Sequence, residues 1–307
     1  MSAIVVRVAA QAKLNLHLRV LAREASGFHS LETIFHRIDL ADDITIETTS
    51  ESRTIAVEGT ETGPPELNLA FRAAEAFSRH AGWPGGFRIE LSKRIPVGAG
   101  LGGGSADAGA VLRALNAVAP RRIGAPGLLS LAASLGSDVP FLTSESVMAL
   151  AWGRGERMLS LPALARHDLL LMTPAFSVST ADAYRWLDED RARQHASNSM
   201  MDYPDSGPGG PEPSLIDAGS LSNWSSILRF ARNDFEAPVA ARHPEMVDYL
   251  ARLRGSRSIF AHMTGSGSTI FGVLDSPPDY AKVPEEHRQN VTTTKTSIDV
   301  LQPVRVA

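Results

Sequence analysis

The sequence contains no cysteine among its 307 residues. Disulfide bonds and thiolate metal sites are therefore excluded, and a reducing compartment is the simplest setting for the chain. No apolar stretch is long enough to cross a bilayer, and Arg7, Lys13 and Arg19 interrupt the apolar residues near the start, where a secretory signal needs an unbroken core. We therefore expect a cytoplasmic protein with no membrane partner.

Runs of basic residues are also missing. The formal net charge is −4 at pH 7, and no cluster of Lys or Arg indicates binding to nucleic acid or anionic lipid. We therefore expect small-molecule partners and no nucleic acid. The length exceeds the usual single-domain range and predicts two domains with a cleft between them.

The pattern of apolar residues predicts both strands and helices, without the regular alternation of a doubly wound sheet, and so favours an α+β fold. In the first half we expect strands over residues 4–8, 14–21, 44–47, 54–58 and 87–93, and helices over 67–80, 106–118 and 128–135. Asn68 or an earlier residue is expected near the start of the first helix, and Gly82 just past its end. In the second half we expect strands over 168–173, 258–262 and 269–274 and a helix over 244–253. We place the domains at residues 1–157 and 158–307. The segment 203–213 is rich in Pro and Gly and is not expected to carry function.

Glycine is concentrated in one loop, between the strand over 87–93 and the helix over 106–118. The loop reads Pro96-Val97-Gly98-Ala99-Gly100-Leu101-Gly102-Gly103-Gly104-Ser105-Ala106. Glycines let a backbone wrap closely around a ligand, and a helix N-terminus, here with Ser105 as the expected N-cap, favours an anion. The loop therefore predicts a phosphate site in which a Cβ at Gly102 or Gly103 would take up phosphate space. A glycine-rich surface turn is the structural alternative.

Two better-known phosphate loops fit this segment less well. No Gly-Lys-Ser/Thr follows the glycines, which excludes a Walker A loop. Gly98, Gly100 and Gly103 satisfy G-x-G-x-x-G, but a dinucleotide site also needs an acidic residue about twenty positions further on. The chain from Ala108 to Ser137 contains no Asp or Glu. A dinucleotide-dependent oxidoreductase is therefore disfavoured.

Three further segments carry candidate polar residues. Lys13 and Asn15 share one face of a strand, Asp138 follows a helix and precedes an expected strand, and a small-residue turn begins at Thr264. Each segment also has an ordinary structural explanation. The first could be the solvated face of a strand, the second a turn or helix cap, and the third a hairpin loop.

Together these segments resemble the GHMP small-molecule kinases, which keep three such motifs in this order. The resemblance rests on the glycine-rich loop and on Ala12-Lys13-Leu14-Asn15-Leu16, Gly27-Phe28-His29-Ser30-Leu31, Gly136-Ser137-Asp138-Val139-Pro140 and Thr264-Gly265-Ser266-Gly267. It implies an N-terminal mixed α/β nucleotide-binding domain, a C-terminal ferredoxin-like domain and phosphoryl transfer from ATP with Mg²⁺. Within the family it points to members that phosphorylate a cytidine diphosphate alcohol in non-mevalonate isoprenoid biosynthesis. We expect a monomer or weak homodimer.

The resemblance also implies a role for each matching residue. Asp138 matches the catalytic base, Lys13 matches its electrostatic partner, and the loop from Pro96 to Ala106 would hold the ATP phosphates. The residues that match substrate contacts are Asn15, Phe28, His29, Asp138, Thr180, Tyr184, Thr264 and Gly265. Ser105 and Asp107 are candidates for holding Mg²⁺, although for Asp107 we favour an interaction with the helix dipole.

Two other interpretations keep the same fold. One is a kinase for mevalonate-type or homoserine-like acceptors, which the Phe28, His29 and Tyr184 matches disfavour because such acceptors have no base to stack. The other is an inactive ligand sensor, which the presence of both Lys13 and Asp138 disfavours. Phe28 stands where relatives usually carry Tyr, so a phenolic contact is absent there.

Overall fold

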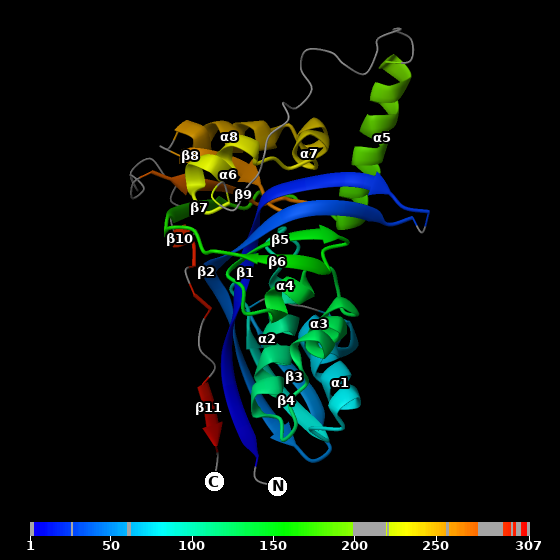
Figure 1. Cartoon of the computed structure of the whole chain (residues 1–307), viewed down its shortest axis with the longest axis vertical. Helices are drawn as coiled ribbons and strands as arrows, with labels where there is room; N and C mark the ends of the chain where they lie inside the picture. Colours follow the sequence, from blue (N-terminus) through cyan, green and yellow to red (C-terminus); the bar gives the residue numbers. More distant parts are fainter. Residues whose placement is uncertain are drawn as a thin grey trace.

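The computed structural model describes residues 3–25, 27–59, 63–198, 219, 221–255, 258–275, 291–295, 297–298 and 302–305. The segment 203–213, which we did not expect to carry function, lies outside these residues. Two long antiparallel strands run along most of the molecule and connect its two domains (Figure 1).

The N-terminal domain is a seven-stranded sheet with helices gathered on one side of it (Figure 1). Its strands are β1 (Ile4–Arg23), β2 (His29–Thr49), β3 (Arg53–Glu58), β4 (Gly86–Ser92), β5 (Met148–Gly153), β6 (Arg157–Leu161) and β11 (Gln302–Arg305). Its helices are α1 (Leu69–Ala81), α2 (Gly103–Val118), α3 (Ala125–Ala133) and α4 (Val139–Thr143), preceded by a 3-10 turn, η1 (Pro65–Leu67). The sheet order is β11-β1-β2-β4-β3, with β5 paired to β2 and β6 to β5.

The strands of this sheet extend further than the sequence predicts. The two strands expected over 4–8 and 14–21 are one continuous strand, β1, and the strand expected over 44–47 is the last part of β2. β5 and β6 were not predicted. Because β6 pairs with β5, the first sheet runs across the predicted boundary at residue 157, and β11 returns to it from the other end of the chain.

The helices show where capping signals were informative. α1 begins after Asn68, whose side chain accepts a hydrogen bond from the backbone of Ala70, and it ends before Gly82 at φ 66°, as predicted. α2 begins earlier than expected, with Gly102 as its N-cap, so the prediction of Ser105 as N-cap is wrong. The segment after Asp138 is the short helix α4 instead of a strand, and a proline in the first turn suits that start.

The C-terminal domain is a four-stranded antiparallel sheet covered by helices. Its strands are β7 (Asp168–Met172), β8 (Ser258–Met263), β9 (Ile270–Leu274) and β10 (Val291–Thr293), and its helices are α5 (Thr180–Asn198), α6 (Trp224–Phe230), α7 (Glu236–Arg242) and α8 (Glu245–Gly255). The order β10-β7-β9-β8, numbered within the domain, is 4-1-3-2. This is the ferredoxin-like arrangement that the resemblance implied.

Each domain has its own hydrophobic core, and residues from each domain pack into the core of the other. Trp224 and Ile227 of α6 pack into the core of the first domain, while Leu18 and Val20 of β1 pack into the core of the second. A strand buried in both cores gives the side chains at its middle a fixed position relative to both domains.

A buried histidine at this junction predicts that the folded protein loses stability at acidic pH. The His36 ring on β2 lies 6.0 Å from the Trp224 ring, and its burial lowers the pKa of His36 from 6.5 to about 4. Below pH 6.5 the histidine is protonated in the unfolded chain but stays neutral in the folded protein until about pH 4. Protonation therefore favours the unfolded chain, so the stability that the neutral, buried His36 contributes is complete above pH 6.5 and is lost as the pH falls toward 4. The full difference is roughly 3 kcal/mol.

His36→Gln should therefore lose less thermal stability than the wild type between pH 7 and pH 4.5, as measured by calorimetry. His80→Gln, at an exposed position of α1, should keep the wild-type dependence. If the melting temperatures of all three proteins fell in parallel with pH, His36 would not contribute the pH dependence that its burial predicts.

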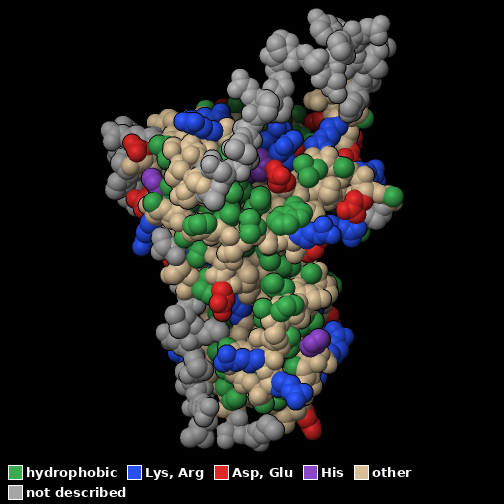
Figure 2. Space-filling view, in the orientation of Figure 1, with side chains coloured by type: hydrophobic (Ala, Val, Ile, Leu, Met, Phe, Trp, Pro, Cys, Tyr) green, Lys and Arg blue, Asp and Glu red, His purple; other side chains and the backbone are tan. Residues whose placement is uncertain are grey.

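Charged side chains of both signs are interspersed on the face shown in Figure 2. This agrees with the near balance of 30 Lys and Arg against 34 Asp and Glu in the whole sequence. Over the described part of the chain, no helix combines the length and the apolar character needed to span a membrane.

Candidate active site

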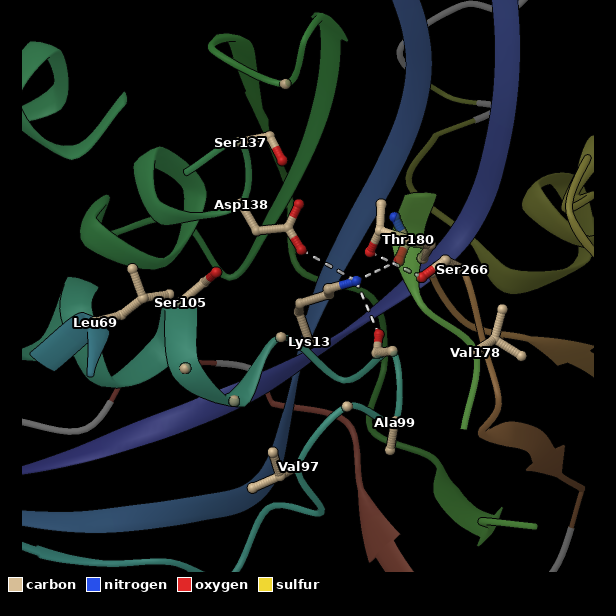
Figure 3. A pocket seen from close by; sticks show the side chains of 18 of the residues that line it. Lys13, Leu69, Val97, Ala99, Ser105, Ser137, Asp138, Val178, Thr180 and Ser266 are labelled. Carbon is tan, nitrogen blue, oxygen red and sulfur yellow. Dashed lines mark hydrogen bonds and ion pairs between the residues drawn. The ribbon is translucent and has the colours of Figure 1, made fainter. Parts of the chain in front are cut away.

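A cleft of about 580 Å³ lies where the two domains meet. The glycine-rich loop, the middle of β1 and the start of α4 bound it on one side, and the start of α5 and the β8–β9 turn bound it on the other. Figure 3 shows Lys13 near its centre, with Asp138, Thr180 and Ser266 around the ammonium group. The predicted site residues that line it are Lys13, Asn15, Pro96, Val97, Gly98, Ala99, Gly100, Gly102, Gly103, Gly104, Ser105, Asp107, Asp138, Thr180, Tyr184 and Gly265.

Lys13 and Asp138 form an ion pair inside this cleft. Lys13 Nζ lies 3.3 Å from Asp138 Oδ2 and donates hydrogen bonds to Asn15 Oδ1 at 2.6 Å and to the Gly100 carbonyl at 3.0 Å (Figure 3). The lysine side chain is 3% exposed, and three oxygen partners compensate the burial of its charge. Asp138 is 28% exposed, and its side chain does not cap α4. A carboxylate that remains accessible beside a fixed ammonium can accept a proton from a bound hydroxyl.

The glycine-rich loop is held in a conformation that depends on glycine. Gly98, Gly100 and Gly102 have φ values of 72°, 79° and 72°, which residues with a Cβ rarely adopt. The loop is fastened to β1 because the backbone N–H of Lys13 donates to the Leu101 carbonyl at 3.0 Å.

The structure adds a second reason for glycine at Gly102 and Gly103. A Cβ on Gly102 would lie 3.0 Å from Cε of Lys13, and a Cβ on Gly103 would lie 3.0 Å from the Ile95 side chain. A side chain at either position would therefore press against the protein, and at Gly102 against the lysine of the ion pair.

The turn that begins at Thr264 closes the opposite side of the cleft. The backbone N–H of Asn15 donates to Thr264 Oγ1 at 3.0 Å, and the N–H of Thr269 donates to the Ala99 carbonyl at 3.1 Å. Asn233, which the sequence analysis missed, donates to the Met263 and Gly265 carbonyls at 2.7 and 2.9 Å. The turn is therefore more than a hairpin connection, since it joins the second domain to β1 and to the glycine-rich loop.

Three predicted site residues line neither this cleft nor the wider one beside it. They are Leu101, Ala106 and Thr264, which are at most 1% exposed. Their side chains serve packing or, for Thr264, hydrogen bonds within the protein. Leu101 and Ala106 belong to the loop motif through their backbone, which sequence matching cannot separate from side-chain contact.

A buried charged cluster beside the loop was also missed. Lys93 Nζ lies 2.8 Å from Asp107 Oδ2 and also bonds Asp42, whose other oxygen accepts from the backbone N–H of Ile95 at 2.8 Å. Burial, helped by the charge of Asp42, raises the pKa of Asp107 to about 7. Asp107 is thus paired with Lys93. Because α2 begins at Gly103, Asp107 lies beyond the first helical turn, where the helix dipole acts, and the preferred dipole role for it is wrong. The signal was Lys93 itself, a charged residue that continues the buried side of the strand after Phe87, Ile89 and Leu91.

A wider cleft of about 1310 Å³ adjoins the first and shares part of its lining. The shared residues are Leu31, Ser137, Arg154, Thr180 and Tyr184. Phe28 and His29 line the wider cleft, so the structure brings Phe28, His29, Thr180 and Tyr184 together as predicted neighbours. Burial and the nearby charge of Asp138 raise the pKa of Tyr184 to about 12, which keeps it a phenol.

The aromatic residues of the wider cleft contact one another. The rings of His29 and Tyr184 are stacked with centroids 4.6 Å apart, and Phe235, which lines the first cleft, meets Tyr184 edge-on at 4.8 Å. Phe28 is 58% exposed, and the Arg154 guanidinium lies 4.1 Å over its ring. This cleft offers aromatic surface and a cation at its junction with the first cleft, which suits an aromatic base bearing phosphate.

Oxygen and nitrogen ligands for a metal are sparse. Within the described ranges, no three His, Asp or Glu side chains are arranged to hold a metal ion. A cation here would need most of its ligands from a bound phosphate and from water.

Comparison with known proteins agrees with this geometry. Residues 68–146 match the family of GHMP kinases N terminal domains, and residues 214–292 match the GHMP kinases C terminal family. The chain is 42% identical over 272 residues to the 4-diphosphocytidyl-2-C-methyl-D-erythritol kinase of Anaeromyxobacter sp. (strain K), covering 86% of this chain and 79% of that protein. It is 34% identical to the Pelotomaculum thermopropionicum kinase of the same name, over 95% and 98% of the two chains.

Solved structures show the same relation. A crystal structure of 4-(cytidine 5'-diphospho)-2C-methyl-D-erythritol kinase matches with a TM-score of 0.71 at 34% identity, over 94% of this chain and 98% of that one. A homoserine kinase from Cytophaga hutchinsonii matches with a TM-score of 0.64 at 17% identity, over 99% and 98% of the chains. The second match, at this low identity, establishes a shared fold only.

Proposed function

The chain belongs to the GHMP kinase family, and we propose that it transfers the γ-phosphoryl group of ATP to the 2-hydroxyl of 4-diphosphocytidyl-2-C-methyl-D-erythritol, in the non-mevalonate route to isoprenoids. The observation that carries the proposal is the Lys13–Asp138 pair at 3.3 Å in a cleft that borders both the glycine-rich loop and the aromatic-lined cleft. The choice of this substrate rests on relatives at up to 42% identity, which are named as kinases of that alcohol.

The chemistry assigned to the pair follows from its geometry. The acceptor hydroxyl oxygen attacks the γ-phosphorus, the bond from that phosphorus to the β-γ bridging oxygen breaks, and ADP leaves. The proton of the hydroxyl passes to the carboxylate of Asp138. Phosphoryl transfer has a loose transition state with charge spread over the moving oxygens, so alignment and positive potential are what the protein must supply. The ammonium of Lys13, fixed by three oxygens, supplies that potential.

We expect the ATP phosphates along the glycine-rich loop, because the first backbone N–H groups of a helix have no partner within it and Gly102, the N-cap of α2, has no side chain that could accept from them. Mg²⁺ would neutralise phosphate charge there. The Ser105 hydroxyl lines the cleft and suits a cation bound mainly by phosphate and water. Asp107, the other candidate, is held by Lys93 and is the weaker one.

The aromatic-lined cleft favours a nucleotide-bearing acceptor over a small aliphatic one. Phe28, His29 and Tyr184 line it, and a mevalonate- or homoserine-type acceptor would leave it unfilled. Because one chain lines both clefts, we propose that a monomer or weak homodimer suffices. The cysteine-free composition and the need for ATP are consistent with a cytoplasmic enzyme.

An ADP-release assay separates this enzyme from an inactive ligand sensor. With ATP and Mg²⁺, we expect release that requires the cytidyl alcohol. Binding of that alcohol without release would favour the sensor.

Tyr184→Ala and His29→Ala are each expected to raise the KM for the cytidyl substrate by roughly 10- to 100-fold, because stacking and a satisfied polar edge each contribute about 1–3 kcal/mol. The KM for ATP should stay near the wild-type value, and Phe28→Tyr should be nearly neutral. Steady-state kinetics with both substrates varied measure this. An unchanged acceptor KM in both alanine variants would place the base elsewhere.

A further inference from the structure

Two contacts fix the His29 imidazole at the edge of the wider cleft. Nε2 lies 2.9 Å from Oδ1 of Asp188, on the next turn of α5 from Tyr184, and one ring face stacks on Tyr184. The His29 side chain is only 8% exposed although it lines the cleft. In the described part of the chain, Nδ1 has no hydrogen-bond partner, so it is the ring atom left for a ligand.

The contact with Asp188 also decides what Nδ1 can offer. An ionised carboxylate only accepts hydrogen bonds, so Nε2 must carry the hydrogen. In a neutral imidazole the other nitrogen is then an acceptor. Arg23 Nη1, 3.9 Å from Asp188 Oδ2, partly balances the carboxylate charge.

An acceptor at this place distinguishes the two common pyrimidines. Cytosine carries an amino group, a donor, at the ring position where uracil carries a carbonyl oxygen, an acceptor. An imidazole acceptor can bind the amino group, but it leaves two acceptors facing each other with uracil. Unpaired polar groups in a site are a strong source of rejection.

The geometry points to Asp188 as a positioning residue that holds His29 as a hydrogen-bond acceptor and thereby makes the cleft select cytosine over uracil. This rests on the proposed function, because it requires the substrate's base to lie at His29. Asp188 acts through the imidazole and is not itself required to touch the substrate.

The test compares kcat/KM for the cytidine diphosphate alcohol and for the same alcohol diphosphate bearing uridine, at about pH 8, where imidazole is ordinarily neutral. The wild type should prefer the cytidyl substrate by at least tenfold. In Asp188→Asn the amide can donate as well as accept, so the tautomer is no longer imposed. The preference should fall about tenfold through the KM for the cytidyl substrate, with kcat nearly unchanged.

Asp182→Asn is the matched control, since it makes the same change on α5 at a residue that lines neither cleft. It should keep the wild-type preference. If the wild type does not phosphorylate the cytidyl alcohol, the proposed function fails. If it does, but shows no preference or keeps the same preference in Asp188→Asn, only the role of Asp188 is overturned.

A spectroscopic measurement on the wild type does not depend on the folding of a variant. The ¹⁵N shifts of His29, assigned by their loss in His29→Ala, should show hydrogen on Nε2 and none on Nδ1 at the same pH. Hydrogen on Nδ1 with a bare Nε2 would overturn the inference.

Discussion

Asp138→Asn is expected to lower kcat by roughly two to four orders of magnitude while the KM for ATP stays within a few-fold of wild type. The amide has nearly the same shape as the carboxylate but can neither accept the hydroxyl proton nor pair with Lys13, whose Nζ is 3.3 Å away. Asp138 does not cap α4, so the change should leave local structure intact.

Asp248→Asn, on the exposed face of α8, is the matched control and should retain wild-type kcat. Lys13→Met should also act mainly on kcat, although the loss of its bond to the Gly100 carbonyl would add some effect on ATP. Steady-state kinetics at saturating ATP decide this. Near wild-type turnover in Asp138→Asn would remove that carboxylate from the chemical step.

Gly102→Val should weaken the affinity for ATP by at least 100-fold, so that binding is no longer measurable. Its φ of 72° belongs to a region that costs a residue with a Cβ about 1–2 kcal/mol. The new side chain would also meet Lys13, since the Cβ alone lies 3.0 Å from Cε of that lysine. Loop conformation and ion-pair geometry would therefore be lost together.

Calorimetric titration with a non-hydrolysable ATP analogue measures this effect. Gly124→Val is the control, because Gly124 has a φ of −64° and open space around its Cβ position. A Gly102→Val protein that melts normally and binds the analogue with wild-type affinity would show that the loop does not hold the phosphates.

Sequence reasoning was strongest where the signal is local. The caps of α1 at Asn68 and Gly82 could be predicted from residue type alone. The density of glycine before α2 likewise predicted a strand–loop–helix unit with special backbone geometry, and three of its glycines do have positive φ. That Lys13 and Asp138 meet came from the family resemblance, because no local pattern relates residues so far apart.

Long-range pairing explains what was missed. The middle of β1 is buried on both faces, so Lys13 and Asn15 lie in the interior along with Leu14 and Leu16, and alternation could not show how far the strand continues. The Lys93, Asp42 and Asp107 cluster joins β2, the end of β4 and α2, and Asn233 reaches the β8–β9 turn from another segment. These contacts depend on the tertiary fold, which the sequence pattern does not contain.

The choice of acceptor tests the account most directly. With ATP and Mg²⁺ held constant, kcat/KM is measured for 4-diphosphocytidyl-2-C-methyl-D-erythritol, mevalonate and homoserine, and the phosphorylated position of each product is identified. The account predicts that the cytidyl alcohol is phosphorylated at its 2-hydroxyl and preferred over the other two by at least about 1,000-fold, since stacking, base-edge and diphosphate contacts are all lost without the nucleotide. Comparable or better turnover of mevalonate or homoserine would contradict it.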